Sequence, residues 1–272
     1  MRRPCSSPVA RRSSSTAELR LWNHVVMGAE RTPYYRADLA LIHHEGFAFH
    51  AEDCAPGILS LLESVRSHHG LVVELGCGSG LLTRQLVDAG HRVIATDASP
   101  PMLDIAREYA GAVQEIRRLT LPDDPIPDAD AIVSVGHVVN YLPDADAIER
   151  ALVAMAEALK PGGLLAIDLC DLTYGEARSA PSTGGWVADD WAIVTEFSLP
   201  SPDRFVRQMA TFVKNEDGSW RRDDERHDNV LIDTSSVPEL LSRHGVRADV
   251  GEAFGNERLP EGLRTLIGRK EG

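Results

Sequence analysis

The segment Glu74–Gly80, which reads Glu-Leu-Gly-Cys-Gly-Ser-Gly, constrains this chain more than any other feature. It follows a short apolar run at 71–75 and precedes a run with helical periodicity at 81–89. Because glycine lacks a Cβ, three glycines at alternate positions permit a tight turn and let the backbone approach a ligand closely. Backbone N–H groups at the start of the next helix can then face an anionic group. The segment therefore predicts a ligand-binding turn between a buried strand and a helix.

The chain on either side of this turn alternates between apolar runs and helical patterns. Strands and helices are expected in the order 71–75 (strand), 81–89 (helix), 92–97 (strand), 101–110 (helix), 112–117 (strand), 129–136 (strand), 145–159 (helix) and 164–169 (strand). Alternation with short connections favours right-handed crossovers and a parallel sheet covered by helices on both faces. The expected fold class is therefore α/β, with a Rossmann-like core.

Helices are also expected before the core, at 17–27, 34–44 and 55–69, with Gly70 ending the last one. After residue 171 the pattern predicts a mobile loop at 175–185, β stretches at 191–199, 204–215 and 219–233, a helix at 237–244, and strands at 247–254 and 263–269. The turn pair Asp217-Gly218 joins two of the β stretches into an antiparallel meander. We expect a seven-stranded, mostly parallel sheet with an N-terminal helical lid and an antiparallel β cap insertion. The expected division is a disordered tail (1–16), a lid (17–69), a cofactor-binding core (70–171), a cap (172–235) and a C-terminal completion of the core sheet (236–272).

Composition narrows the function classes. The 272 residues carry a formal net charge of −13, and an acidic surface repels nucleic-acid phosphates, so a nucleic-acid partner is not expected. No apolar run approaches the roughly 20 residues of a membrane span. The four cysteines lie far apart without a Cys-x-x-Cys pair, which favours neither a metal site nor a disulfide framework and fits a reducing cytoplasm.

Dinucleotide binding is the main alternative for the glycine turn. Its fingerprint, Gly-x-Gly-x-x-Gly, places the third glycine one position later, where this chain has Leu81. Asp97 ends the second expected strand, and its carboxylate can accept hydrogen bonds from both hydroxyls of a ribose. NAD enzymes use an acidic residue in the same way, so Asp97 alone does not discriminate between nucleotides.

Four features in order carry a family resemblance. They are the glycine turn, the run 97–103 (Asp-Ala-Ser-Pro-Pro-Met-Leu), the run 134–137 (Ser-Val-Gly-His) and the run 160–163 (Lys-Pro-Gly-Gly). With them, the chain resembles the small-molecule branch of the class I S-adenosylmethionine-dependent methyltransferases over about residues 71–171. The resemblance implies S-adenosylmethionine as cofactor.

The resemblance also implies a set of cofactor-binding residues. They are Glu74, Gly76, Gly78, Gly80, Asp97, Ala98, Met102, Leu119 and Gly136. The glycines of the turn would face the methionine portion, Asp97 would hold the ribose, and Ala98 and Met102 would lie near the adenine. Leu119 or Thr120 stands at the adenine edge, where the family often has an acidic residue. Two roles stay open for Glu74: a hydrogen bond to the loop backbone or a contact with the amino group of the cofactor.

The acceptor side is less sharply marked. His137 is the first candidate for a catalytic base or substrate contact, because it follows the fourth strand and histidine titrates near neutrality; a structural hydrogen bond is the alternative. His227 is a second candidate; the alternative is that it lies on a solvent-exposed strand rich in charged residues and has no role in the site. Substrate contacts are expected from Tyr34, His43, Asn140, Tyr141 and Arg207.

These features lead to one expected function. The chain is expected to transfer a methyl group from S-adenosylmethionine to N or O of a small-molecule metabolite, without a metal. An NAD-dependent oxidoreductase and a non-catalytic S-adenosylmethionine-binding protein are the alternatives. The pattern leaves a homodimer open.

Overall fold

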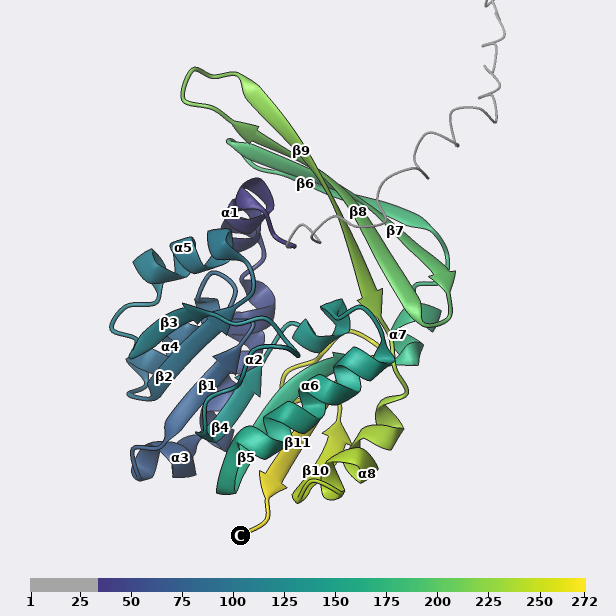
Figure 1. Ribbon diagram of the computed structural model, residues 1–272. Helices are drawn as coiled ribbons and strands as arrows, with labels where there is room; N and C mark the ends of the chain where they lie inside the picture. Colours follow the sequence, from purple (N-terminus) through teal and green to yellow (C-terminus); the bar gives the residue numbers. More distant parts are fainter. Residues whose placement is uncertain (1–33) are drawn as a thin grey trace, which may run out of the picture. The chain divides into compact units, whose positions relative to one another are not determined.

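A seven-stranded sheet organises the computed structural model, which describes residues 34–272 (Figure 1). In sheet order the strands are β10 (Val246–Gly251), β11 (Leu263–Lys270), β5 (Leu159–Cys170), β4 (Ala129–Ser134), β1 (Leu71–Leu75), β2 (Arg92–Asp97) and β3 (Glu115–Arg118). β11 runs antiparallel to both of its neighbours, and the other pairings are parallel. The expected Rossmann-like, mostly parallel sheet is confirmed.

Helices cover both faces of this sheet because successive strand side chains point to opposite faces. Val72 packs with α2 (Phe49–Leu61), α3 (Glu63–Ser67) and α4 (Leu81–Asp88). The next residue, Val73, packs in a second apolar layer with α6 (Ala145–Ala158) and α8 (Val237–Ser242). Both layers are apolar, which explains why the core strands read as continuous hydrophobic runs.

Local signals set several of these boundaries. Gly90 follows α4 with a φ of 85°, as a residue after a helix end often does. α5 (Pro100–Tyr109) begins after Ser99, whose Oγ accepts a hydrogen bond from Met102 N. The helices expected at 81–89, 101–110 and 145–159 therefore agree with the structure to within one residue at each end.

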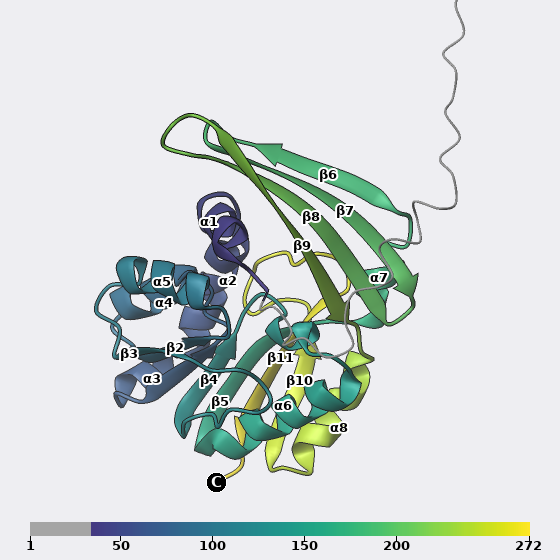
Figure 2. The same ribbon diagram turned by 45° about the horizontal axis from the view of Figure 1, so that its top comes forward.

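A second sheet contains β6 (Ser182–Val187), β7 (Trp191–Ser201), β8 (Arg204–Lys214) and β9 (Trp220–Val230), all antiparallel in that order. Figures 1 and 2 show this cap sheet beyond the carboxyl ends of the core strands, with α1 (Ala37–Gly46) between the two sheets. α1 contacts α5 of the core as well as β7 and β8 of the cap. The cap is thus joined to the core by an N-terminal helix as well as by the chain connections.

Some expectations at the edges of the fold are wrong. The segment 175–185 is not a mobile loop, since α7 (Leu172–Glu176) and β6 occupy most of it and β6 pairs with β7 through main-chain groups that need no particular side chains. The helix expected at 55–69 begins at Phe49, includes Pro56 within α2, and is divided into α2 and α3 at Leu62. His69, rather than Gly70, has the positive φ after it.

The expected tail at 1–16 and helix at 17–27 lie outside the described residues. Within residues 34–272, no helix combines the length and the apolar character that crossing a bilayer requires.

Candidate active site

The strand order reverses direction between β1 and β4. The chain proceeds from β1 to β2 and β3 on one side, and continues with β4 and β5 on the other. In open α/β sheets, ligands bind at the carboxyl ends of the strands next to such a reversal. The glycine turn, Asp97, Gly136 and Asp168 all lie at this edge. This edge is therefore the candidate site.

The three glycines of the turn differ in what surrounds them. Gly76, Gly78 and Gly80 have positive φ values of 69°, 54° and 84°. A Cβ on Gly76 would lie 2.3 Å from Cγ2 of Val138, and one on Gly80 would lie 3.1 Å from Cβ of Ala110. These two glycines permit close packing within the protein.

Open space adjoins two other glycines at this edge. A Cβ on Gly78 would meet nothing nearer than the sulfur of Met102 at 3.9 Å, and one on Gly136 would meet no atom within 4 Å. Both have a positive φ, so a side chain is disfavoured there even though space for one exists. A turn whose backbone is bare and faces open space is what a ligand lying against the main chain requires. This cradle fits the expected cofactor.

Asp97 links the glycine turn to the next strand. Its Oδ2 accepts a hydrogen bond from Gly78 N at 2.9 Å, and its Oδ1 accepts one from Ser99 N at 2.8 Å. Burial raises the pKa of this carboxyl. A carboxylate oxygen has more than one lone pair, so the group retains acceptor capacity for a sugar diol. Asp97 thus shapes the turn and remains suited to its expected role.

Three of the expected adenine-side residues lie around Asp97. Met102 is buried below Gly78. Ala98 is half-buried between Asp97 and the cap residue of α5. Leu119 N donates to the main-chain oxygen of Asp97 at 3.1 Å, with its side chain in the core. The structure therefore brings these residues together at one end of the edge.

Glu74 has a role that the sequence did not suggest. The side chain is buried, and its Oε2 accepts a hydrogen bond from Oγ1 of Thr83 at 2.6 Å. Burial raises the pKa of this carboxyl to about 8. The expected hydrogen bond to the loop backbone is wrong, because the partner is a hydroxyl in the first turn of α4. Contact with the amino group of the cofactor stays a prediction.

Asp168, in β5, fixes the loop that follows β4. Its Oδ1 accepts a hydrogen bond from His137 N at 2.5 Å, and its Oδ2 accepts one from Gly136 N at 3.0 Å. Nε2 of His50 lies 2.8 Å from the same Oδ2. These bonds hold Gly136 and His137 in left-handed conformations, with φ values of 103° and 47°.

Asp168 and His50 also shift each other's titration. Burial alone would lower the pKa of His50, but the hydrogen bond and charge of Asp168 raise it. Burial alone would raise the pKa of Asp168, but the hydrogen bond and charge of His50 lower it. No sequence pattern points to His50, since its partner is 118 residues away.

Side chains from four separate segments converge around this loop. They are Tyr34 and Tyr35 before α1, His43 in α1, His137 and Tyr141 at the 3-10 helix η2 (Val138–Tyr141), and Arg207 and His227 in β8 and β9. We call these seven residues the acceptor-side cluster. All but Tyr35 were expected as site residues, and the structure brings them together.

Ring contacts and hydrogen bonds connect the cluster. The hydroxyls of Tyr35 and Tyr141 are 2.9 Å apart, and Nη2 of Arg207 donates to Tyr141. The rings of His137 and Tyr141 stack with centroids 5.6 Å apart. The ring of Tyr34 lies 4.6 Å from that of His227. The cluster is therefore one contiguous polar and aromatic group.

The histidines of this cluster are neutral at pH 7. Burial, and then the charge of Arg207, lower the pKa of His137 to about 3 and that of His43 to about 4. Burial also lowers the pKa of His227, although Nε2 of this residue lies 3.0 Å from Glu225. A neutral imidazole can accept a hydrogen bond through one nitrogen and donate through the other.

Asn140 does not act as expected. It is fully buried, and its amide nitrogen donates to the main-chain oxygens of Cys170 and Val230. Its amide oxygen accepts a hydrogen bond from Cys170 N. The expectation of a substrate contact is wrong because both amide hydrogens are used to join η2 to β5 and β9. This side chain supports the junction of cap and core.

The segment before α1 is fastened to both core and cap. Tyr35 N donates to Glu225 at 2.9 Å, and the main-chain oxygen of Tyr35 accepts a hydrogen bond from Ser99 Oγ at 2.7 Å. Arg36 pairs with Asp223 of β9 at 2.7 Å. Tyr35 needs a left-handed conformation, with a φ of 58°, to make these contacts. The sequence offers no signal for them, since they join residues more than 60 positions apart.

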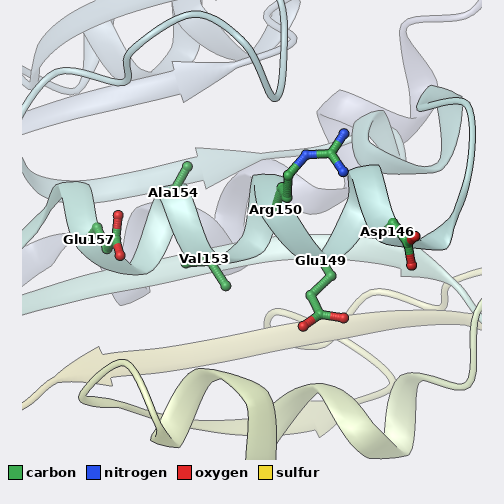
Figure 3. A pocket seen from close by; sticks show the side chains of 6 residues that line it. All are labelled: Asp146, Glu149, Arg150, Val153, Ala154 and Glu157. Carbon is green, nitrogen blue, oxygen red and sulfur yellow. The ribbon is translucent and has the colours of Figure 1, made fainter.

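Two hollows lie elsewhere on the surface. One, of about 420 Å³, is lined by Asp146, Glu149, Arg150, Val153, Ala154 and Glu157 along one face of α6 (Figure 3). A second, of about 550 Å³, lies between α6, the end of β9 and α8. Neither hollow is lined by the glycine turn, Asp97 or the acceptor-side cluster. The two hollows are therefore separate from the candidate site at the carboxyl edge.

Comparison with known proteins bears directly on this edge. Residues 72–163 match the family model described as a methyltransferase domain. A demethylmenaquinone methyltransferase from Tropheryma whipplei is 37% identical over 113 residues, which cover 40% of this chain and 45% of that protein. The chain thus spans about half the length of the curated relatives that it matches first.

Solved structures superpose on a larger part of this chain than the sequence matches cover. An S-adenosylmethionine-dependent methyltransferase from Clostridium acetobutylicum superposes with a TM-score of 0.73 at 18% identity, over 86% of this chain and 98% of that one. The sugar N-methyltransferase KedS8 from Streptoalloteichus superposes with a TM-score of 0.71 at 18% identity, over 92% and 100%. At such identities these likenesses show the fold, including the cap. The domain match identifies residues 72–163 as a methyltransferase domain, and the solved structures show that the chain shares the fold of S-adenosylmethionine-dependent methyltransferases.

Proposed function

We propose that this protein transfers the methyl group of S-adenosylmethionine to N or O of a small-molecule metabolite. The observation that carries the proposal is the cradle at the carboxyl edge, where the bare backbone of Gly78 faces open space and is bonded to the carboxylate of Asp97. The third glycine of a dinucleotide fingerprint is absent, since Leu81 begins α4 instead. This turn favours a methionine-containing nucleotide over NAD.

Within this proposal the chain's own residues bind and align. When bound, the cofactor supplies a methyl group activated on a sulfonium. Gly78 and Gly136 would leave room for it, Asp97 would accept hydrogen bonds from its ribose, and Met102 and Leu119 would adjoin its base. The acceptor-side cluster would then contact the methyl acceptor. A displacement at carbon depends chiefly on alignment, and a closed cap that excludes water supports it.

We propose that His137 orients the acceptor atom. Its Nδ1 is buried without a hydrogen-bond partner in residues 34–272, and Asp168 fixes its main chain. At a pKa of about 3 the imidazole is a weak proton acceptor by itself. Accepting a hydrogen bond from an amine or hydroxyl would direct the lone pair of that group toward the methyl carbon. His227, held by Glu225, supports the neighbouring rings rather than the acceptor atom.

A small acceptor is favoured by the cap and by charge. The cap sheet lies beyond the carboxyl edge with α1 between the two sheets (Figure 1), and KedS8, a sugar N-methyltransferase, shares the fold over 92% of this chain. The net charge of −13 disfavours a nucleic-acid acceptor.

Two measurements test the proposal. Differential scanning fluorimetry with S-adenosylhomocysteine and with NAD should show stabilisation by S-adenosylhomocysteine alone; stabilisation by NAD alone would favour the oxidoreductase alternative. A radiolabelled methyl-transfer screen over amines and alcohols should find an acceptor. Binding without transfer to any member of a broad panel would favour a non-catalytic binding protein.

A further inference from the structure

Arg207 is a half-buried cation that has no carboxylate partner among residues 34–272. Its Nε is buried and has no hydrogen-bond partner in the part of the chain that the structure describes. Its Nη2 donates to the hydroxyl of Tyr141 and, at 3.4 Å, to Oδ1 of Asn229. Both of these partners are neutral. No carboxylate of residues 34–272 lies within the 4.0 Å of an ion pair with Arg207.

Other arginines of the cap sheet differ in this respect. In β9, Arg221 pairs with Asp38 at 2.6 Å, Arg222 with Asp224 at 2.6 Å, and Arg226 with Asp228 at 2.7 Å. These three are more exposed than Arg207 and have less need of a partner. A guanidinium stays charged in proteins, and a charge taken out of water is costly unless it is paired. Arg207, which has a greater need of an anion than these three arginines of β9, therefore lacks the carboxylate that each of them has.

Polar atoms around Arg207 also lack hydrogen-bond partners in residues 34–272. Six buried side-chain nitrogen or oxygen atoms in residues 34–272 have no hydrogen-bond partner, and four of them belong to the acceptor-side cluster. These four are Nε of Arg207 and Nδ1 of His43, His137 and His227. Buried polar groups are normally satisfied, so such a concentration indicates a ligand that supplies the missing bonds.

We propose that the methyl acceptor carries an acid group, a carboxylate or a phosphate, that binds to Nε of Arg207. This inference rests on the proposed function and deepens it by naming the class of acceptor. Nε is the donor of this guanidinium that has no partner, and a hydrogen bond from a charged guanidinium to a carboxylate or a phosphate is about twice as strong as one between neutral groups. The acceptor amine or hydroxyl of the same molecule would then face His137.

Binding of an acid group would also change His137. The charge of Arg207 is the second largest cause, after burial, of the lowered pKa of His137. An anion on the guanidinium would offset that charge and raise the pKa of the imidazole. Binding of the acid group to Arg207 would thus strengthen the hydrogen bond that His137 accepts from the amine or hydroxyl of the same molecule. An acceptor without the acid group would be oriented less well.

The experiment measures anion binding to the full chain loaded with S-adenosylhomocysteine. Isothermal titration with acetate, benzoate and inorganic phosphate is compared in the wild type and in the variants Arg207→Gln, Arg207→Lys and Arg226→Gln. Arg226 is the control, since it is an exposed arginine on the same sheet with its own carboxylate. Circular dichroism verifies that each variant is folded, and Arg207→Lys retains the charge if Arg207→Gln does not fold.

We expect saturable binding of at least one anion class, about 10-fold or more weaker in Arg207→Gln, intermediate in Arg207→Lys and unchanged in Arg226→Gln. Preference for carboxylates or for phosphate identifies the acid group. Absence of saturable binding in the wild type, or equal binding in Arg207→Gln, overturns the proposal. A loss of S-adenosylhomocysteine affinity in Arg207→Gln also overturns it, because Arg207 would then serve the cofactor. If the wild type binds anions but not S-adenosylhomocysteine, the proposed function fails and the anion site stands.

Discussion

The two sides of the candidate site are built in different ways. On the core side, the chain presents main-chain groups in a short contiguous turn, with Gly78 bonded to Asp97 from the neighbouring strand. On the cap side, the acceptor-side cluster presents side chains from four segments that span residues 34–227. The core side leaves space next to bare backbone. The cap side leaves buried polar atoms without partners.

This difference separates recognition of the cofactor from recognition of a particular methyl acceptor. A backbone cradle recognises groups that every S-adenosylmethionine molecule has, so a fixed local motif suffices. A cluster of side chains can be altered one residue at a time without disturbing the sheet beneath it. We therefore expect changes on the core side to affect cofactor binding or folding, and changes on the cap side to affect the acceptor.

The largest expected effect separates two glycines of the same turn. Gly76→Ala should lower the free energy of unfolding by about 3 kcal/mol, because the methyl group combines a clash with Val138 and a left-handed strain. Gly78→Ala should cost only about 1 kcal/mol in folding, since no clash accompanies the strain. It should instead weaken S-adenosylhomocysteine binding.

Urea denaturation and calorimetry measure both quantities. Gly90→Ala is the matched control, because its φ is 85° and a Cβ there would meet nothing within 4 Å. It should cost about 1 kcal/mol without an effect on binding. Equal destabilisation by Gly76→Ala and Gly78→Ala would contradict the distinction between the two glycines.

The next largest effect concerns the ribose. Asp97→Asn should weaken S-adenosylhomocysteine binding by about 10- to 100-fold, since hydrogen bonds to a charged group contribute about 1.5–3 kcal/mol. Asp104→Asn, on the exposed side of α5, removes a carboxylate paired with Arg107 and should leave the affinity unchanged. Calorimetry with the two variants gives the comparison. An unchanged affinity in Asp97→Asn would remove the carboxylate from the cofactor site.

A pH series distinguishes the histidines of the two sides. His50, bonded to Asp168, has a folded pKa above its ordinary value of 6.5, so its contribution to stability is present below pH 6.5 and is lost as pH rises through the raised pKa. His43, in the acceptor-side cluster, has a folded pKa of about 4, so its unfolded form binds the proton first. Its contribution is lost as pH falls from 6.5 to about 4.

Urea denaturation of the wild type, His50→Gln and His43→Gln between pH 5 and pH 8 measures these slopes. The stability advantage of the wild type over His50→Gln should shrink as pH rises above 6.5. The stability of the wild type relative to His43→Gln should fall as pH is lowered below 6.5. Slopes of the same sign would show that one of the two environments is wrongly described.

The smallest effect concerns the contact between α1 and the cap. Arg221→Gln removes the pair with Asp38 and should cost about 1 kcal/mol or less, diminishing in high salt, because partly exposed ion pairs contribute little. Arg222→Gln removes a pair within β9 and should cost less still. Thermal unfolding at low and high salt compares them. A large, salt-independent loss in Arg221→Gln would show that α1 depends on this pair for folding.

The core side was predictable because local rules determine it. Periodicity placed β1, β2, α4 and α5 to within one residue, and the spacing of the turn glycines separated it from a dinucleotide fingerprint. These elements bury continuous apolar runs, and their connections are short. Sequence reading nevertheless treated the three glycines alike, whereas only the structure shows that Gly76 and Gly80 serve packing.

The cap side was predictable only in part. Residue type and position suggested Tyr141 and Arg207, but nothing local distinguished them from Asn140, whose amide is used by β5 and β9. His50 was missed because its partner, Asp168, is distant in sequence and its role arises from a tertiary contact. The strand β6 was missed because Gly-rich segments have little intrinsic preference for a sheet, and pairing with β7 overrides it.

The most direct test of the account is amide hydrogen exchange of the full chain with and without S-adenosylhomocysteine. We predict increased protection at residues 76–80, 97–102 and 135–138, with β6 and α8 unchanged. No change at the glycine turn at saturating S-adenosylhomocysteine, or protection confined to the cap sheet, would contradict the claim that bare backbone at the carboxyl edge of the core sheet holds the cofactor.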